Sequence, residues 1–260
     1  YTVVCSSAAY PEQLATWKSA RLLYLPFKAN GWQSMLYDAV ALLKLRLKRV
    51  DTILLLGVSG SFMLPIIRLG SGPRIVTNID GLEWQRDKWS ASAARLLRWL
   101  ERIAVRYSDV IIADNRGISD YVRSTYDIEP VEIAYGGDHG LGHQARPPVE
   151  LPPKGYSFAL SRIEPENSVS MVLEAFGNNP KQKPLVYVGN WDSSAYGRAL
   201  RAQWAATPWL HLLDPVYDQA VLRWYRENAW LYVHGHSAGG TNPSLVEAMH
   251  AGVAIAARDV

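Results

Sequence analysis

The stretch WLYVHGHSAGGTNPSLVEAM, residues 230–249, carries the clearest structural signal in the sequence. It begins with the apolar run Trp230–Val233, passes through a Gly-rich loop, and continues in a helical pattern over Ser244–His250. A strand that leads into a helix through glycines is typical of parallel α/β sheets, where the loop lies at the carboxyl edge. The stretch therefore predicts an α/β fold and marks one edge of its sheet as a candidate ligand site.

Short apolar runs and longer helical patterns alternate over the rest of the chain. The other runs predicted as strands are Tyr1–Cys5, Thr52–Leu56, Arg74–Asn78, Val110–Ala113, Tyr156–Leu160, Leu185–Val188, Trp209–Leu213 and Val253–Ala256. The other helical patterns are Ser90–Tyr107, Ser168–Phe176 and Gln219–Asn228. This alternation predicts parallel sheets joined by crossover helices.

A Pro-rich segment divides the alternation into two parts. Residues 146–155 contain four prolines, a density that is typical of a linker between domains. We therefore expect a Rossmann-like domain over residues 1–146, a linker over 147–153 and a second Rossmann-like domain over 154–260. A ligand cleft is expected between the two domains, at the carboxyl ends of their strands.

Composition and motifs exclude several classes of function. The net charge of +3 over 260 residues is too small to indicate nucleic acid as a partner. The single cysteine excludes an internal disulfide framework and a zinc cluster, and fits a reducing, intracellular setting. No apolar run reaches the roughly 18 residues of a membrane span. The sequence also lacks a Walker motif, a G-x-G-x-x-G after a strand, an Asp-x-Asp motif and a nucleophile elbow.

The Gly-rich loop and the helix after it are candidates for binding a nucleoside diphosphate. Glycines at 239 and 240 allow the backbone to approach a ligand closely. Free N–H groups at the start of the following helix favour a diphosphate. Glu247 lies near that start, where a carboxylate can accept hydroxyl groups of a ribose. The alternative is a tight turn with an Asn or Ser as N-cap.

Two further segments place polar residues toward the expected cleft. Arg162 follows the strand Tyr156–Leu160, and arginine suits bidentate contacts with phosphate. The alternative is a surface arginine paired with Glu164 or Glu166. Asp138 and His139 follow a Gly-Gly pair just before the Pro-rich segment, where they are candidate polar contacts to an acceptor. The alternative for that segment is a flexible hinge.

The end of the strand Arg74–Asn78 supplies candidates in the first half. Asp80 and Glu83 are placed to bind or deprotonate an acceptor hydroxyl. The alternative is an Asx-type turn that Asp80 caps, with Gly81 in a left-handed conformation.

The helical pattern Ser90–Tyr107 carries a basic stripe. An apolar face is predicted at Leu96, Leu100, Ile103, Ala104 and Tyr107. Four arginines follow the opposite face, at Arg95, Arg98, Arg102 and Arg106. A basic stripe beside tryptophans suits an anionic membrane surface. The alternative is a solvated helix face.

Taken together, five segments resemble the retaining GT-B glycosyltransferases of family 4, and most closely the bacterial rhamnosyltransferase-like branch. They are residues 78–89 (NIDGLEWQRDKW), 101–115 (ERIAVRYSDVIIADN), 135–139 (YGGDH), 161–167 (SRIEPEN) and 234–249 (HGHSAGGTNPSLVEAM). The last segment is highly specific for this branch, and the others are specific in their combination and order. The resemblance implies an α/β fold of GT-B type, with two facing Rossmann-like domains.

The resemblance also implies roles for individual residues. In the family an arginine after the first strand of the second domain binds the donor diphosphate, which here matches Arg162. A lysine five residues later is replaced by Asn167, and the first of the family's two glutamates is replaced by Gly239. The second glutamate matches Glu247 and is expected to bind the ribose. The backbone of Gly239, Gly240 and Thr241 and the side-chain amide of Asn242 are expected to replace the missing donor contacts. Asp80 stands near a histidine that contacts the transferred sugar in many relatives, so Asp80, Arg162 and Glu247 are the expected catalytic residues.

The expected reaction is transfer of a sugar from a nucleoside diphosphate sugar, with dTDP-L-rhamnose favoured, to a hydroxyl group. The expected acceptor is a lipid-linked saccharide in bacterial surface polysaccharide synthesis, at the inner face of the plasma membrane. No cofactor or metal is expected. The alternatives are a non-hydrolysing nucleotide-sugar epimerase and a non-catalytic nucleotide-sugar-binding module. Relatives extend beyond both ends of the sequence, so the resemblance implies missing parts and we expect little activity from this chain alone.

Overall fold

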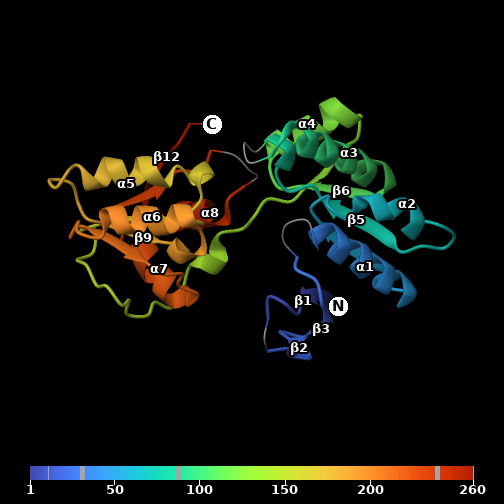
Figure 1. Cartoon of the computed structure of the whole chain (residues 1–260), viewed down its shortest axis with the longest axis horizontal. Coiled ribbons are helices and arrows are strands. Elements are labelled where there is room, and N and C mark those ends of the chain that lie inside the picture. Colours follow the sequence, from blue (N-terminus) through green and yellow to red (C-terminus); the bar gives the residue numbers. More distant parts are fainter. Residues whose placement is uncertain (11, 30–32, 86–88, 238–240, 260) are drawn as a thin grey trace. The chain divides into compact units, whose positions relative to one another are not determined.

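The computed structural model describes residues 1–10, 12–29, 33–85, 89–237 and 241–259. It forms two compact units, Tyr1–Ile133 and Ala134–Val260 (Figure 1). We expected the first domain to extend to residue 146. In the structure, residues 134–153 group with the second unit instead. Part of the reason is that the Tyr225 hydroxyl accepts the N–H of Val149, at 3.2 Å, and donates to its carbonyl, at 3.0 Å.

The first unit contains a three-stranded and a four-stranded sheet. In the smaller sheet, β3 (Ala20–Leu25) lies between β1 (Thr2–Ser6), which is parallel to it, and β2 (Thr16–Trp17), which is antiparallel. The larger sheet has four parallel strands in chain order, β4 (Thr52–Leu56), β5 (Arg74–Asn78), β6 (Val110–Ala113) and β7 (Val131–Glu132). The predicted bounds of β4, β5 and β6 are confirmed.

Helices cover one face of the four-stranded sheet. They are α1 (Gln33–Leu47), α2 (Leu64–Ile67), α3 (Ala91–Tyr107) and α4 (Arg116–Tyr126), with 3-10 turns η1 (Ser61–Met63) and η2 (Glu83–Gln85). Ile53 and Ile75, paired across β4 and β5, are buried against Leu42 and Leu64 of this layer. Side chains alternate across a strand, so Leu54 and Leu56 lie on the other face, where they are exposed.

The predicted helix with the basic stripe is α3, and Ser90 caps its start by accepting the N–H of Ala93 at 3.3 Å. Its arginines are exposed, as the stripe predicts. The predicted apolar face is wrong at Leu96, which is exposed. The residues of α3 that are buried are Leu100, Glu101, Ala104 and Val105. The buried face of α3 is therefore rotated relative to the predicted one and includes Glu101. Its carboxylate can be buried because it has hydrogen-bond partners inside the unit.

The second unit is built on one parallel sheet. Its strand order is β10 (Leu210–Leu213), β9 (Leu185–Val188), β8 (Ser157–Leu160), β11 (Leu231–His234), β12 (Ala254–Ala257). Starting from β8, the chain adds β9 and β10 on one side of the sheet. It then returns and adds β11 and β12 on the other side of β8. This reversal makes a topological switch point between β8 and β11, the place where open α/β sheets bind ligands.

Helices lie on both faces of this sheet (Figure 1). They are α5 (Val169–Gly177), α6 (Ala195–Trp204), α7 (Gln219–Glu227) and α8 (Pro243–His250), with 3-10 turns η3 (Asp138–Gly140), η4 (Pro165–Asn167) and η5 (Trp191–Ser193). Phe158 is buried in the core against α7, and its neighbour Ala159 in the core against α5 and α6. Adjacent residues of a strand therefore pack into cores on opposite faces of the sheet. Because both faces are buried, the sequences of these strands are continuous apolar runs.

Candidate functional site

The loops after β8 and β11 meet at the switch point of the second unit. The N–H and hydroxyl of Ser237 both donate to the carbonyl of Glu166, at 3.0 and 2.7 Å. Gly235 passes so close to the carbonyl oxygen of Asn167 that no larger residue fits there. Glu166 and Ser237 are 71 residues apart in sequence. Two segments that were each chosen as candidates therefore form one local structure.

Arg162 extends from this loop with 64% of its side chain exposed. Its guanidinium lies 3.6 Å from Glu166, a loose pairing that a phosphate can replace. Asn167, in contrast, is buried and donates its side-chain amide to the Arg162 carbonyl at 2.7 Å. The geometry therefore gives Asn167 the task of shaping the loop and leaves Arg162 accessible.

The start of α8 has the capping geometry of the alternative interpretation. The side-chain oxygen of Asn242 accepts the N–H of Ser244 at 3.0 Å and its hydroxyl at 2.6 Å, and Pro243 occupies the first turn. The Asn242 amide nitrogen lies 2.7 Å from Nε2 of His236. Both ends of this amide are engaged within the protein, while Thr241 precedes the cap. Gly239 and Gly240 lie outside the described residues.

Glu247 lies in α8 at the centre of a charged cluster. Its Oε2 contacts Nη2 of Arg226, and its Oε1 lies 2.8 Å from Nε2 of His139. Arg226 is completely buried, whereas the side chain of His139 is 59% exposed. The cation of Arg226 lies in the last turn of α7, where the helix dipole favours a positive charge. Sequence reasoning missed Arg226.

The Gly-Gly segment before His139 packs tightly against α8. A Cβ at Gly137 would lie 2.7 Å from the Val246 carbonyl oxygen, and one at Gly140 would lie 3.1 Å from Cγ of Glu247. Gly137 is therefore required for this close approach, and Gly140 leaves little space for a side chain beside Glu247. The structure brings His139 to Glu247 and leaves Asp138 exposed on the same turn.

Two histidines lie where β11 leads into the Gly-rich loop: His234 ends the strand and His236 follows it. The rings of His234 and His236 stack with their centroids 4.4 Å apart. Burial lowers the pKa of His234, so its imidazole stays neutral at neutral pH. Tyr232 of β11 is also buried. Burial raises the pKa of Tyr232 to about 12, and its hydroxyl donates to the hydroxyl of Ser244 at 2.8 Å.

The candidates of the first unit follow β5 in a well-defined loop. The predicted Asx turn forms at a different residue, because Asn78 accepts the N–H of Asp80 at 3.1 Å. Asp80 itself has the left-handed conformation, with φ 57°, rather than Gly81. Asp80 is exposed, and Glu83 begins the turn η2. A left-handed aspartate costs about 1 kcal/mol, so the surrounding contacts must hold this loop.

A buried carboxylate holds the far end of that loop. Glu101 of α3 accepts from the hydroxyls of Tyr121 and Tyr126, both at 2.5 Å, and from the indole N–H of Trp84 at 3.1 Å. The guanidinium of Arg98 stacks over the ring of Trp84, 4.3 Å from the ring centroid. Sequence reasoning missed Glu101, although its spacing of three and four from Ala104 and Val105 places it in the buried stripe.

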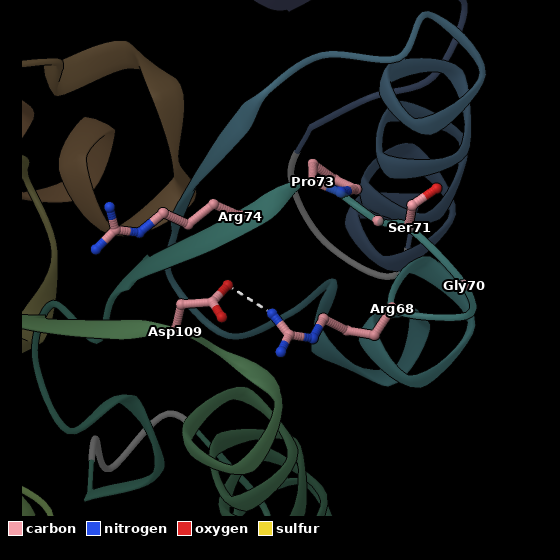
Figure 2. Close-up of a pocket in the computed structure, with 7 residues that line it drawn as sticks. Arg68, Gly70, Ser71, Pro73, Arg74 and Asp109 are labelled. Carbon is pink, nitrogen blue, oxygen red and sulfur yellow. Dashed lines mark hydrogen bonds and ion pairs between the residues drawn. The ribbon is translucent and has the colours of Figure 1, made fainter.

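A cavity of about 370 Å³ lies at the opposite, amino-terminal edge of this sheet (Figure 2). It is lined by Arg68, Gly70, Ser71, Gly72, Pro73, Arg74 and Asp109. Asp109 accepts from Arg68 at 2.5 Å and from the N–H of Ile75 at 2.7 Å, and the Arg68 guanidinium holds its pKa below the usual range. The carboxylate thus joins α2 to the strands, and the cavity lies away from the candidate residues Asp80 and Glu83.

Residues 36–138 match the family model described as a domain of unknown function, DUF1972. No curated protein matches the sequence significantly. Among the described residues, no helix has both the length and the apolar character that crossing a bilayer requires.

Solved structures with the same fold are found at low sequence identity. Sucrose-phosphate synthase from Thermosynechococcus elongatus has a TM-score of 0.75 at 14% identity, covering 92% of this chain and 65% of its own. The catalytic domain of starch synthase IV from Arabidopsis thaliana, bound to ADP and acarbose, has 0.61 at 13%, covering 88% and 62%. A protein from Listeria monocytogenes named as a UDP-N-acetylglucosamine 2-epimerase has 0.57 at 11%, covering 92% and 66%.

These likenesses show the fold class. The chain has the α/β, Rossmann-like fold of the GT-B glycosyltransferases, as the sequence predicted. It spans less than two thirds of the length of each of these structures.

Proposed function

We propose that the chain belongs to a glycosyltransferase that moves a sugar from a nucleoside diphosphate sugar to a hydroxyl group. The observation that carries this proposal is the position of Glu247. It lies in α8, the helix that follows the switch-point loop. Its Oε2 contacts the guanidinium of Arg226, and its Oε1 lies 2.8 Å from Nε2 of the exposed His139. A fixed carboxylate beside a helix start suits a ribose hydroxyl next to a diphosphate. The starch synthase IV catalytic domain, a fold neighbour bound to ADP, supports the choice of a nucleoside diphosphate as ligand.

In this proposal the residues have separate roles. Arg162 stabilises the charge that grows on the leaving diphosphate. The contribution expected from the first amides of α8 is wrong, because Pro243 has no N–H and those of Ser244, Leu245 and Val246 donate to Asn242. The resemblance assigns the backbone of Thr241 to the phosphate side, and the same role expected of Gly239 and Gly240 falls on residues outside the described part of the chain. The family resemblance gives acceptor-side roles to Asp80 and Glu83 of the first unit and to Asp138 and His139 of the second. It also implies retention of the anomeric configuration.

The finer assignment is a rhamnosyltransferase that uses dTDP-L-rhamnose and a lipid-linked saccharide acceptor in bacterial surface polysaccharide synthesis. It rests on the specificity of residues 234–249 for that branch. The chain would then work as a peripheral protein on the cytoplasmic face of the plasma membrane. The reaction breaks the bond between the sugar and the diphosphate, and it requires no metal or cofactor.

Replacing Arg162 with Ala should weaken dTDP-L-rhamnose binding at least tenfold, about 1.4 kcal/mol, because an exposed cation that meets the diphosphate is lost. Isothermal titration measures the change. Arg146→Ala is the matched control, since Arg146 is an exposed arginine paired with Glu150 at 2.7 Å. Equal dissociation constants for the Arg162 variant, Arg146 variant and wild type would remove the assignment.

Membrane association is proposed through the arginines of α3. Arg98 and Arg106 stack on Trp84 and Tyr107, at 4.3 and 5.8 Å from the ring centroids, so the informative change is Arg95→Glu with Arg102→Glu. The double variant should bind phosphatidylglycerol-rich vesicles at least tenfold more weakly, because each arginine near an anionic surface contributes about 1 kcal/mol to the binding free energy. Vesicle co-sedimentation measures this, with Lys181→Glu and Arg146→Glu as a control of the same charge. Equal loss in both would point to net charge rather than this face.

The second candidate function is a nucleotide-sugar epimerase, because the Listeria monocytogenes neighbour carries that name and the same fold. The two functions give different products. An epimerase converts the nucleotide sugar with no acceptor present, whereas a transferase releases nucleoside diphosphate only when it meets an acceptor. A binding module does neither.

A further inference from the structure

The cavity at the amino-terminal edge of the four-stranded sheet has a polar and charged lining (Figure 2). Its volume of about 370 Å³ lies at the lower end of the range for ligand pockets, roughly 300–1,000 Å³. The charged residues that line it are Arg68, Arg74 and Asp109. A cavity of this size with this lining suits a small charged ligand rather than an apolar one.

The charge of the lining is positive. Asp109 is ionised, because the Arg68 guanidinium and the N–H of Ile75 hold the pKa of its carboxyl below the usual range. This carboxylate offsets the charge of one arginine. The guanidinium of Arg74 forms no hydrogen bond or ion pair with any residue that the structure describes. One positive charge of the cavity is therefore left for a ligand to compensate.

Both arginines have donors to offer a ligand. Arg68 points toward Asp109 and uses only Nη1 in that contact, so its Nε and Nη2 are not engaged by the described residues. Arg74 extends from the first residue of β5 away from this pair (Figure 2). It is exposed and can turn toward the cavity without breaking a contact. Guanidinium groups with free edges bind phosphate through paired hydrogen bonds.

The loop between α2 and β5 is shaped so that its carbonyl groups do not oppose an anion. A Cβ at Gly72 would lie 2.6 Å from the last carbonyl oxygen of α2, so the loop can fold back here only with a glycine. Arg46 of α1 donates to the carbonyls of Leu69 and Ser71, at 2.8 and 3.2 Å. The carbonyl between them accepts the N–H of Gly72 at 3.0 Å. Three oxygens that would repel an anion are therefore already engaged.

We propose that this cavity is a binding site for a phosphate group, held by Arg68 and Arg74 and separate from the candidate nucleotide site of the second unit. The ligand class is a phosphate monoester, either a small phosphorylated molecule or the headgroup of a phosphomonoester lipid. The site lies within the first unit, and the proposal does not depend on the identity of the sugar donor.

Isothermal titration of inorganic phosphate into the wild-type chain, in a phosphate-free buffer, tests the proposal. The wild type should bind phosphate saturably, and Arg74→Gln should bind it about tenfold more weakly or worse, because a charged donor is lost. Arg146→Gln is the matched control for the loss of one exposed charge. Arg162→Ala should bind phosphate within about threefold of wild type, because Arg162 belongs to the other unit.

A change of the opposite sign separates binding from structure. Asp109→Asn keeps an oxygen for the N–H of Ile75 and removes the charge that repels an anion, so phosphate should bind about threefold more tightly or better. Circular dichroism checks that each variant is folded. If Asp109→Asn does not fold, the comparison of Arg74→Gln with wild type still decides, since Arg74 is exposed.

Three results would overturn the proposal and leave the proposed function intact. They are the absence of saturable phosphate binding, equal dissociation constants for Arg74→Gln and wild type, and a loss of phosphate binding in Arg162→Ala alone. The last result would mean that phosphate binds in the second unit.

Co-sedimentation with vesicles identifies the source of the phosphate group. Phosphatidic acid carries a monoester, whereas phosphatidylglycerol carries a diester, and the two vesicle types are matched in surface charge. A preference for phosphatidic acid that disappears in Arg74→Gln would support the lipid headgroup. Equal binding to both vesicles, together with phosphate binding in solution, would support a small phosphorylated molecule.

Discussion

Replacing Glu247 with Ala should lower the free energy of unfolding by about 3–5 kcal/mol, the usual effect of removing one partner of a buried ion pair. Arg226 is completely buried and Glu247 is its ion-pair partner, so the variant leaves a cation in the core. Urea unfolding followed by circular dichroism measures the change. Glu174→Ala is the matched control, because Glu174 is an exposed glutamate in helix α5 of the same unit and should have an effect within about 0.5 kcal/mol.

The neutral double variant Arg226→Met with Glu247→Gln separates stability from binding. It removes both charges together, so it should recover most of the stability that Glu247→Ala loses. It should still bind dTDP-L-rhamnose at least tenfold more weakly than wild type. A double variant that regains binding along with stability would show that Glu247 is only a structural counter-ion. A Glu247→Ala variant as stable as wild type would contradict the buried pair itself.

Replacing Glu101 with Ala should cost about 3 kcal/mol or more, because three buried or half-buried donors lose their acceptor at once. Burial and the hydrogen bond to Glu101 together raise the pKa of Tyr121 and Tyr126, so both phenols are neutral donors at ordinary pH. Glu129→Ala is the control, since Glu129 pairs with Arg123 on the surface and its removal should leave the stability almost unchanged.

The same variant tests how the loop after β5 is held. Trp84 links this loop to Glu101, and Asp80 lies four residues before it in a left-handed conformation. Urea unfolding gives the stability, and limited digestion with chymotrypsin, which cleaves after Trp84, gives the local opening. We expect faster cleavage there in Glu101→Ala than in Glu129→Ala. Equal rates would mean that Glu101 does not hold the loop.

Part of the fold was predictable from local pattern. The bounds of β4, β5, β6 and β9 match the predicted runs, because each is an apolar segment bounded by polar or turn-forming residues. Other elements lack that contrast. The helix α6 contains Gly197, which weakens a helical pattern but is needed because a Cβ there would contact the Trp191 carbonyl oxygen.

The candidate site was predictable only in outline. Residues 161–167 and 234–249 were chosen from loop chemistry, and parallel strand order then brings them together. Arg226 was not predictable, because its charge resembles that of an exposed residue in an amphipathic helix. Its burial depends on Glu247, which lies 21 positions later and is placed by the sheet rather than by local sequence.

The boundary between the two units was set by contacts that the sequence pattern does not contain. Proline density indicated a linker at residues 147–153, but Val149 is bound by Tyr225 and the segment before it packs on α8 through Gly137 and Gly140. The prolines therefore favour an extended backbone in this segment. Contacts with side chains of the second unit determine that the segment belongs to that unit.

The central claim is that the second unit binds a nucleoside diphosphate sugar at the switch point between β8 and β11. Ligand-observed NMR tests it directly, with dTDP-L-rhamnose, UDP-glucose, GDP-mannose and free dTDP titrated against the wild type and Arg162→Ala. We predict selective binding of dTDP-L-rhamnose, competed by dTDP and weakened at least tenfold in Arg162→Ala. Preference for another nucleotide sugar would contradict the rhamnosyl assignment, and the absence of binding by all four would contradict the central claim.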